Sequence, residues 1–322
     1  MYKTFGDLLK HLRNKHKITQ SYIAKLTGYS ADTIRGIENN RSTPSVSLVN
    51  NLSHIFNMDL NKYFYIYEHN IPTGEQNAFI EFRSAIEELD KKKLIELIKR
   101  HENNLYFQSN DGLQLIYYAK AVCEYPTNKE ASIRYTNLAL SVSDISMENL
   151  DLENQIYTIT VYSILNFIII LHLDETKLSF AENLALTLYE NLNNNFFSDL
   201  TTTYLNFSET TRLYIVLLNN LSDIELRKNN VDAALNYINK SINICIYNYK
   251  PYLLHKLYFT KFECLYQGEY FKDAIFVFEQ ILMFSSVVNP KVTSKYFNEL
   301  YDQFPEMLKI MDISFLRAKY LP

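Results

Sequence analysis

The stretch that decides the fold of the N-terminal region is Ile18-Thr-Gln-Ser-Tyr-Ile-Ala-Lys-Leu-Thr-Gly-Tyr-Ser-Ala-Asp-Thr-Ile-Arg-Gly-Ile-Glu-Asn-Asn40. Thr19 and Ser30 are residue types that cap the N-terminus of a helix, and they precede the segments 20–26 and 31–39. Gly28 lies between the segments, where a left-handed glycine can end the first helix. The stretch therefore predicts two short helices joined by a tight turn.

Apolar residues define the sides of these helices that we expect to pack inward. In the segment 20–26 they are Tyr22, Ile23 and Leu26, and in the segment 31–39 they are Ile34 and Ile37. The spacing of three and four residues places them on one helical face. We therefore expect the opposite, polar face of the second helix to remain free.

Further helices are predicted on both sides of this pair. The segment 5–15 has apolar residues at positions 5, 8, 9 and 12, which form a helical stripe. Pro44 and Ser45 open a helix over 45–56, and a fifth helix is expected to begin near Asn61. The apolar face of the helix over 45–56 is expected to comprise Val46, Val49, Leu52 and Ile55.

Residues 4–56 resemble the repressor-type helix-turn-helix family. The matching features are Thr19-Gln20 at the start of the second helix, Gly28 at the turn, Ile37-Glu38-Asn39 at the end of the third helix, and Pro44. The resemblance implies that the helix over 31–39 enters the major groove of double-stranded DNA. The DNA-contacting residues that it implies are Lys17, Gln20, Ser30, Ala31, Asp32, Thr33, Arg35, Gly36, Arg41 and Ser45.

The chemistry of these residues suggests how DNA is read. Arg35 can donate two hydrogen bonds to one guanine, and Gln20 is expected to reach the phosphate backbone or an outer base. Gly36 brings no side chain and Asp32 can only accept, so we expect DNA shape to contribute to specificity. Glu38 is expected to be structural and to pair with Arg13 of the first helix.

Composition favours a helical protein whose two ends differ in charge. Only 6 Gly and 7 Pro occur in 322 residues, whereas folds rich in sheet need more turn residues. Residues 1–70 hold nine Lys or Arg against five Asp or Glu, a net charge of +4. The remainder holds 23 against 31, a net charge of −8. A basic N-terminal domain on an acidic body fits a polyanion-binding head.

No sequence pattern indicates an enzyme, a metal site or a cofactor. The seven His residues form no His-x-x-x-His pair, and no glycine-rich phosphate loop occurs. We interpret Cys123, Cys245 and Cys264 as reduced core thiols of a cytosolic protein. The most apolar run, residues 164–173, is too short to cross a bilayer, and no secretory signal begins the sequence. These features predict a cytoplasmic protein that is not bound to a membrane.

An internal repeat organises the second part of the chain. Residues 229–242 align with residues 269–282 at a spacing of 40, which places Ala234 and Ala274 at the same position. Weaker copies are Lys129–Leu140 and Leu178–Leu188. Hairpins of this kind bury their apolar faces only by stacking on one another, which generates a concave inner surface.

We therefore predict an all-α protein. A five-helix repressor-type helix-turn-helix domain is expected at residues 1–69 and a linker around Ile71-Pro-Thr-Gly74, at residues 70–76. A tetratricopeptide-like right-handed superhelix of helical hairpins, serving peptide sensing and dimerisation, is expected at residues 77–322.

This layout resembles the peptide-sensing regulators of Gram-positive bacteria, the Rap/Rgg/NprR/PlcR/PrgX group, and most closely its PlcR and PrgX types. The local likeness includes Asn239-Lys-Ser-Ile-Asn-Ile-Cys245 and Gly268-Glu-Tyr270. The resemblance implies a quorum-sensing transcription regulator, a homodimer on operator DNA whose binding is controlled by a short signalling peptide in the concave surface.

Asn side chains offer a donor and an acceptor to an extended peptide backbone, and aromatic side chains offer pockets. Asn220 aligns with a peptide-holding Asn of the PlcR type, and Asn166, within an apolar run, needs a partner if it is buried. The candidate peptide-binding residues are Asn166, Asn206, Tyr214, Asn220, Asn243 and Tyr247.

Two alternatives remain open for the second domain. It can bind a protein partner, as in a repressor that is controlled by an antirepressor. It can also serve only for dimerisation, with DNA binding that responds to no ligand. A small secreted-peptide gene beside this one would favour the peptide-sensing hypothesis over both alternatives.

Overall fold

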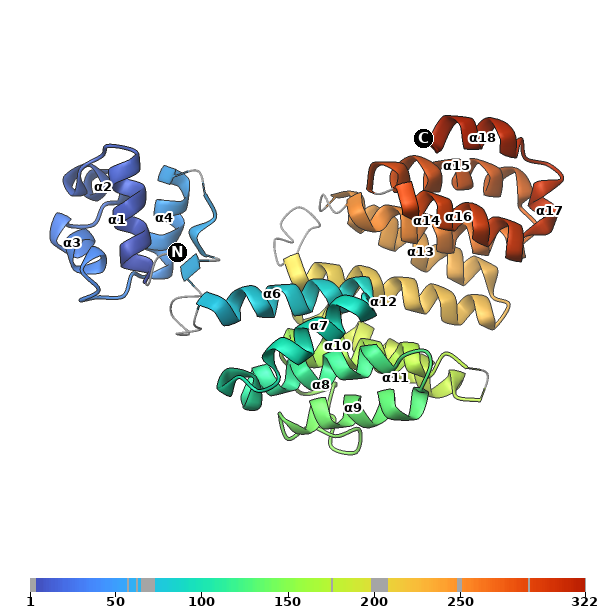
Figure 1. The fold of residues 1–322 in the computed structure, drawn as a ribbon, viewed down its shortest axis with the longest axis horizontal. Coiled ribbons are helices and arrows are strands. Elements are labelled where there is room, and N and C mark those ends of the chain that lie inside the picture. Colours follow the sequence, from blue (N-terminus) through green and yellow to red (C-terminus); the bar gives the residue numbers. More distant parts are fainter. Residues whose placement is uncertain are drawn as a thin grey trace. The chain divides into compact units, whose positions relative to one another are not determined.

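In the computed structural model the described residues are 4–56, 58–61, 63–64, 73–174, 176–197, 208–247, 251–288 and 290–321. The chain divides into two compact units, Met1–Cys123 and Glu124–Pro322. The regular elements of the described residues are all helical, and these residues contain no strand (Figure 1). The predicted all-α class is therefore confirmed.

The first unit begins with four short helices, α1 (Phe5–Lys15), α2 (Gln20–Thr27), α3 (Ala31–Glu38) and α4 (Val46–Phe56), drawn in blue in Figure 1. Residues 60–61 and 63–64 are also helical, where the sequence predicts a fifth helix. The helices enclose one apolar core, to which α1 contributes Leu9, α2 Ile23 and α3 Ile34, each fully buried.

Capping side chains fix where these helices begin and end. Thr19 Oγ1 accepts from the backbone N–H of Tyr22, and Ser30 Oγ accepts from that of Thr33. Gly28 has a φ of 76° and ends α2 in the left-handed conformation that glycine adopts without steric cost. The predicted caps at Thr19 and Ser30 and the predicted turn at Gly28 are therefore confirmed.

Three residues predicted to face inward lie at the surface instead. Tyr22, Leu26 and Val46 are 50%, 51% and 63% exposed. The core side of α2 is formed by Ile23, Ala24 and Thr27, a stripe rotated by about one residue from the predicted one. Such a rotation is hard to exclude from sequence in a helix of two turns. Val46 is the first residue of α4, ahead of the buried residues Leu48, Val49, Leu52 and Phe56.

The first unit continues with α6 (Thr73–Glu88), α7 (Lys91–His101), a short 3-10 helix (Leu105–Gln108) and α8 (Asn110–Glu124). Because α6 begins at Thr73, the last four residues of the predicted linker 70–76 belong to a helix. Phe82, His101 and Phe107 form an aromatic cluster with ring centroids 5.4–6.1 Å apart. This cluster joins α6, α7 and the 3-10 helix.

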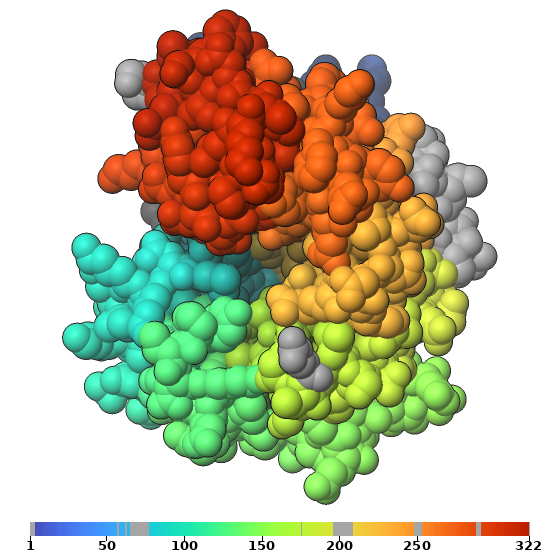
Figure 2. Space-filling model, turned by 90° about the vertical axis from the view of Figure 1, so that its right-hand side faces the viewer, coloured from blue at the N-terminus to red at the C-terminus, as the bar shows by residue number. Residues whose placement is uncertain are grey.

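The second unit is a stack of helical hairpins. It comprises α9 (Lys129–Ser141), α10 (Ile159–Leu171), α11 (Leu178–Leu192), a π-helical turn (Asn193–Phe197), α12 (Ser208–Arg227), α13 (Val231–Tyr247), α14 (Pro251–Gln267), α15 (Phe271–Val288), α16 (Pro290–Gln303), α17 (Pro305–Leu308) and α18 (Ile313–Tyr320). The first helices of successive hairpins, α10, α12 and α14, contact one another in order. In the space-filling view the stack runs from yellow-green through gold and orange to red (Figure 2).

The predicted repeat is visible in the backbone. Asn229 and Glu269, which are 40 residues apart, have φ angles of 60° and 61° and end α12 and α14 in the same way. Asn230 N–H donates to Glu225 O at 2.9 Å, and Tyr270 N–H donates to Leu265 O at 2.8 Å. These bonds are the six-to-one contact of a Schellman motif. The two hairpins are therefore built on one geometry.

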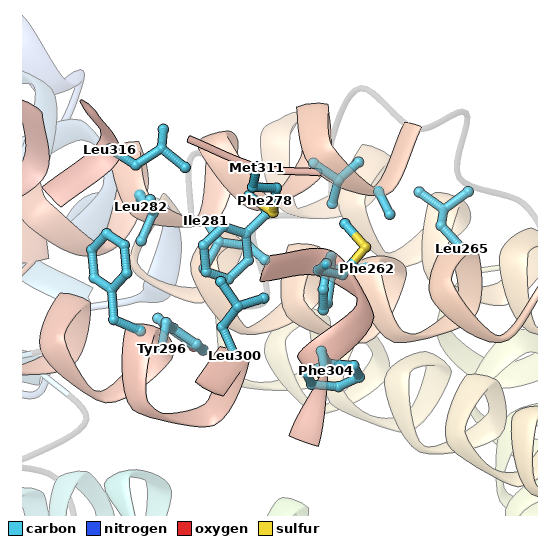
Figure 3. Packing of buried hydrophobic residues seen from close by; sticks show 14 residues of the cluster. Phe262, Leu265, Phe278, Ile281, Leu282, Tyr296, Leu300, Phe304, Met311 and Leu316 are labelled. Carbon is cyan, nitrogen blue, oxygen red and sulfur yellow. The ribbon is translucent and has the colours of Figure 1, made fainter. Parts of the chain in front are cut away.

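Apolar packing holds the repeats together. Ala234 and Ala274 are fully buried at equivalent positions of α13 and α15, as predicted for sites where helices cross closely. Phe262 of α14, Phe278 of α15 and Leu300 of α16 lie in one cluster at the C-terminal end of the stack (Figure 3). The three cysteines are buried, as predicted, and form no disulfide with one another.

Candidate DNA-binding surface and peptide site

The helix α3 is held at both ends by local hydrogen bonds. At its start the hydroxyls of Ser30 and Thr33 lie 2.9 Å apart, and Ser30 also caps the helix. At its end Asn40 adopts a φ of 56°, and Arg41 N–H donates to Gly36 O at 2.8 Å. Asn is among the residues that tolerate this left-handed conformation, so α3 ends without the usual glycine.

A buried carboxylate ties α3 to α1 and α2. The side chain of Glu38 is 1% exposed and accepts from Arg13 Nε at 2.6 Å and from Arg13 Nη2 at 3.0 Å. The hydrogen bond with Glu38 raises the pKa of Arg13. Gln20 Nε2 donates to the same carboxylate at 2.7 Å. The predicted pair of Arg13 and Glu38 is confirmed. Its carboxylate also orients Gln20, which the sequence predicts to contact DNA.

The opposite face of α3 carries an exposed ion pair. Arg35 Nη2 pairs with Asp32 Oδ1 one turn earlier, and their side chains are 60% and 79% exposed. Gly36 lies beside Arg35, and a Cβ atom there would approach Ser42 Oγ to 2.9 Å. This neighbour is the end of a serine side chain, which can rotate away, so the contact does not by itself require a glycine here.

The remaining predicted DNA contacts lie at or near the ends of helices. Lys17 has a φ of 56° just after α1 and is exposed, as is Arg41 just after α3. Ser45 accepts from Leu48 N–H at 3.2 Å, and its hydroxyl lies 2.8 Å from Tyr29 Oη. Ala31 and Thr33 are half-buried on α3.

Two of the predicted peptide-binding residues are neighbours in space. Asn220 Nδ2 on α12 donates to Asn166 Oδ1 on α10 at 2.9 Å, although 54 residues separate them in sequence. Asn166 is 7% exposed and Asn220 is 6% exposed. Asn220 is therefore the partner that a buried amide at Asn166 requires.

Tyr214 lies on a different side of α12 from Asn220, because six residues turn a helix by about 600°. Its ring stacks on Tyr189 with centroids 5.6 Å apart, and its hydroxyl donates to Asn193 Oδ1 at 3.2 Å. Lys240 Nζ donates to the hydroxyls of Tyr189 and Tyr214 at 2.7 and 3.2 Å. Burial raises the pKa of Tyr214. This side chain belongs to a cluster with α11 and α13.

The other predicted peptide-binding residues are not brought to the asparagine pair. Asn243 and Tyr247 are exposed near the end of α13, and Tyr247 is 72% exposed. Asn206 lies outside the described residues.

Sequence reasoning missed one feature of the candidate DNA-binding surface and one ionisable group elsewhere in the second unit. One is the Asp32–Arg35 pair, for which the i,i+3 spacing of opposite charges was the available signal. The other is Glu263 on α14, where burial, together with the charges of Asp223 and Glu299, raises the pKa to about 8. Its neighbours come from α12 and α16, so no local sequence pattern could have revealed it.

Neither a metal-binding cluster nor a membrane-spanning helix occurs in the part of the chain that the structure describes. No group of three His, Cys, Asp or Glu side chains there is placed to hold a metal ion. None of the helices found there is long and apolar enough to cross a membrane.

Comparison with known proteins fits the geometry of the first helices. Residues 9–63 match the protein family described as Helix-turn-helix. These residues are a helix-turn-helix domain. Its second and third helices are α2 and α3, so the exposed Asp32–Arg35 pair lies on the third helix of the helix-turn-helix domain. No curated protein matches the chain.

One of the compared solved structures resembles this chain over most of its length, and two others align with lower TM-scores. The structure of Bacillus thuringiensis PlcR in complex with the peptide PapR7 and DNA is 16% identical, with a TM-score of 0.66, over 94% of this chain and 100% of PlcR. Apo ComR from Streptococcus vestibularis is 11% identical, with a TM-score of 0.48, over 93% of this chain and 97% of ComR. The Streptococcus dysgalactiae pheromone receptor Rgg2(C45S) is 18% identical, with a TM-score of 0.36, over 76% of this chain and 93% of Rgg2(C45S).

The likeness to PlcR concerns the fold. It spans the helix-turn-helix domain and the helical hairpins together. The resemblance to the peptide-sensing group, predicted from the sequence, is therefore confirmed at the level of architecture.

Proposed function

We propose that this protein is a cytoplasmic transcription regulator that binds operator DNA and responds to a short signalling peptide. The observation that carries the proposal is a helix-turn-helix domain joined to a helical body with the fold of PlcR, whose solved structure contains a peptide and DNA. The proposal assigns DNA binding to the first domain, peptide binding to the helical hairpins, and no catalytic activity to either.

The described geometry of α3 supports DNA binding. Its inner face is fixed by Ile34, Ile37 and the Glu38 pair, so the helix can enter a major groove without rearranging. Glu38 accepts a hydrogen bond from one amide N–H of Gln20. The second amide N–H of Gln20 can donate to a DNA phosphate at the start of α2. One such helix reads few base pairs, so we propose a homodimer whose two heads engage grooves about 34 Å apart.

The asparagine pair supports peptide binding. The hydrogen bond between Asn166 and Asn220 uses the side-chain oxygen of Asn166 and one amide N–H of Asn220. The second amide N–H and the side-chain oxygen of Asn220 remain for other partners. An extended peptide presents N–H and C=O groups that such an amide can satisfy whatever the peptide sequence. We therefore place the peptide backbone beside α10 and α12, with Asn220 as its main contact.

The test uses synthetic peptides that match the product of any small secreted reading frame beside the gene. Peptide affinity is measured by calorimetry for the wild type, for Asn220→Ala and for Asn236→Ala, an exposed control on α13. We expect Asn220→Ala to weaken peptide binding by about 10-fold, since a lost hydrogen bond to a buried group costs about 1–3 kcal/mol. The control is expected to bind peptide as the wild type does.

DNA affinity in the absence of peptide is the second quantity measured, and it should be the same for the wild type and both variants. Unaltered peptide affinity in Asn220→Ala would contradict the placement of the peptide. Absence of binding by any such peptide would favour a protein partner or a dimerisation scaffold.

A further inference from the structure

We propose that Asp32 and Arg35 act on DNA as one base-reading unit, in which Asp32 orients the Arg35 guanidinium toward a guanine and accepts a hydrogen bond from a neighbouring base. The inference rests on the proposed DNA-binding function and makes Asp32 a determinant of specificity. It assigns the acidic residue a favourable role on a polyanion, where a lone carboxylate would weaken binding.

The geometry of the ion pair leaves the groups that guanine recognition needs. Arg35 Nη2 faces Asp32 Oδ1, one turn away on the same exposed side of α3. A guanidinium has five N–H donors in a planar fork, and two of them are on Nη2. When one Nη2 N–H donates to Asp32, the other still forms a parallel pair with Nη1, and this pair can donate to the O6 and N7 acceptors of guanine. Asp32 Oδ2 can accept from the exocyclic amino group of a cytosine or an adenine.

The neighbouring residues of α3 offer fewer polar atoms to a base than Asp32 and Arg35 do. The Thr33 hydroxyl lies 2.9 Å from the Ser30 hydroxyl at the start of the helix. Ala31 and Gly36 carry no polar side chain. Between residues 31 and 36, Asp32 and Arg35 are the two charged side chains, and both are more than half exposed.

The two possible roles of Asp32 predict opposite changes in DNA affinity when its charge is removed. An exposed ion pair contributes little to the stability of the free protein, so its loss should leave the fold intact. If Asp32 were an unrelated surface charge, its removal would reduce repulsion from the phosphates and strengthen DNA binding. If Asp32 orients Arg35, its removal weakens binding to the preferred sequence alone.

The experiment begins with selection of preferred duplexes from a random pool by the full-length wild-type protein. We expect enrichment of a guanine next to a base pair that offers an amino group in the major groove. Affinities for the enriched duplex and for an unrelated duplex are then measured for the wild type and for Asp32→Ala, Arg35→Ala and the double variant. Asp7→Ala, an acidic residue of α1, controls for the loss of one negative charge in the same domain.

We expect Asp32→Ala to lose about 10-fold in affinity for the enriched duplex and to bind the unrelated duplex no more weakly than the wild type. In the Arg35→Ala background the same change should cost much less, because the oriented guanidinium is already absent. Equal or tighter binding of Asp32→Ala to the enriched duplex, as expected for Asp7→Ala, would overturn the proposal. Failure of the wild type to enrich any sequence would overturn the proposed DNA-binding function itself.

Discussion

At the scale of single residues, Glu38 connects three helices of the helix-turn-helix domain through Arg13 and Gln20. Its carboxylate is almost fully buried, whereas the Arg13 side chain is 16% exposed. Removal of the arginine would leave a buried charge whose remaining described partner is one amide, and a broken buried pair costs about 3–5 kcal/mol.

We therefore predict that Arg13→Ala lowers the stability of the helix-turn-helix domain by about 3 kcal/mol. Native-state hydrogen exchange of the α1 and α3 amides in the full chain measures this change. The double variant Arg13→Met, Glu38→Leu should lose less, because no charge remains buried. A larger loss in the double variant than in Arg13→Ala would show that the pair itself provides the stability.

Glu263 gives the second unit a pH dependence of defined sign. Burial, the charges of Asp223 and Glu299, and an opposing effect of Arg227 leave its pKa at about 8, against 4.5 for an ordinary glutamate. Between these values the folded protein holds a proton that the unfolded chain has released. Stability therefore falls as the pH rises from about 4.5 to about 8 and stays lowered above that range.

We predict that Glu263→Gln is more stable than the wild type by about 1–3 kcal/mol at pH 8.5, and that this difference shrinks toward pH 5. Urea unfolding of the full chain at several pH values measures it, with the exposed residue change Glu130→Gln as control. A stability difference that is independent of pH would contradict the role given to burial of the carboxyl group.

Residue pairs were predictable from sequence only where a family pattern or short spacing links their members. The Arg13–Glu38 pair was expected, and the structure contains it. The partnership of Gln20 with Glu38, and that of Asn166 with Asn220, depends on how separate helices meet in space. Composition and periodicity do not encode such distances.

At the scale of elements, the fit of α1 against the end of α3 depends on the absence of a side chain at Gly6. A Cβ atom there would collide with the backbone carbonyl oxygen of Ile37 and approach Asn40 Oδ1 to 2.6 Å. The carbonyl is backbone and cannot rotate away. Gly36, in contrast, would meet only the Ser42 side chain.

We predict that Gly6→Ala destabilises the helix-turn-helix domain by about 1–3 kcal/mol, although alanine is the better helix former. Gly36→Ala is the matched control and should be neutral or stabilising by up to about 1 kcal/mol. Hydrogen exchange of the α3 amides reports both changes. A gain of stability in both variants would contradict the close contact between Gly6 of α1 and the Ile37 carbonyl of α3.

Helix boundaries were predicted more accurately than helix faces. The segment 5–15 matches α1, and caps at Thr19 and Ser30 mark the starts of α2 and α3, because capping is local chemistry. Which side of α2 is buried depends on how α1 and α4 pack against it, and the sequence of α2 alone does not determine this. Tyr22 and Leu26 are therefore exposed although they are apolar. The hairpin repeat was found because its geometry recurs at a fixed spacing.

At the scale of the whole molecule, charge separates the proposed roles of the two domains. Residues 1–70 carry a net charge of +4 in a chain whose total is −4. DNA binding that neutralises phosphates releases counterions, so its affinity falls steeply with salt. A peptide can change that affinity only if it binds one arrangement of the paired heads better than another.

The measurement that tests peptide-controlled DNA binding most directly is fluorescence anisotropy of labelled duplex DNA from upstream of the gene. It is made with the full-length protein at about 50 and 200 mM salt, with and without the synthetic peptides described above. We predict tight binding that weakens at the higher salt and that at least one peptide shifts. Tight binding that no peptide alters would contradict peptide control, and absence of specific binding at either salt would contradict the DNA-binding function.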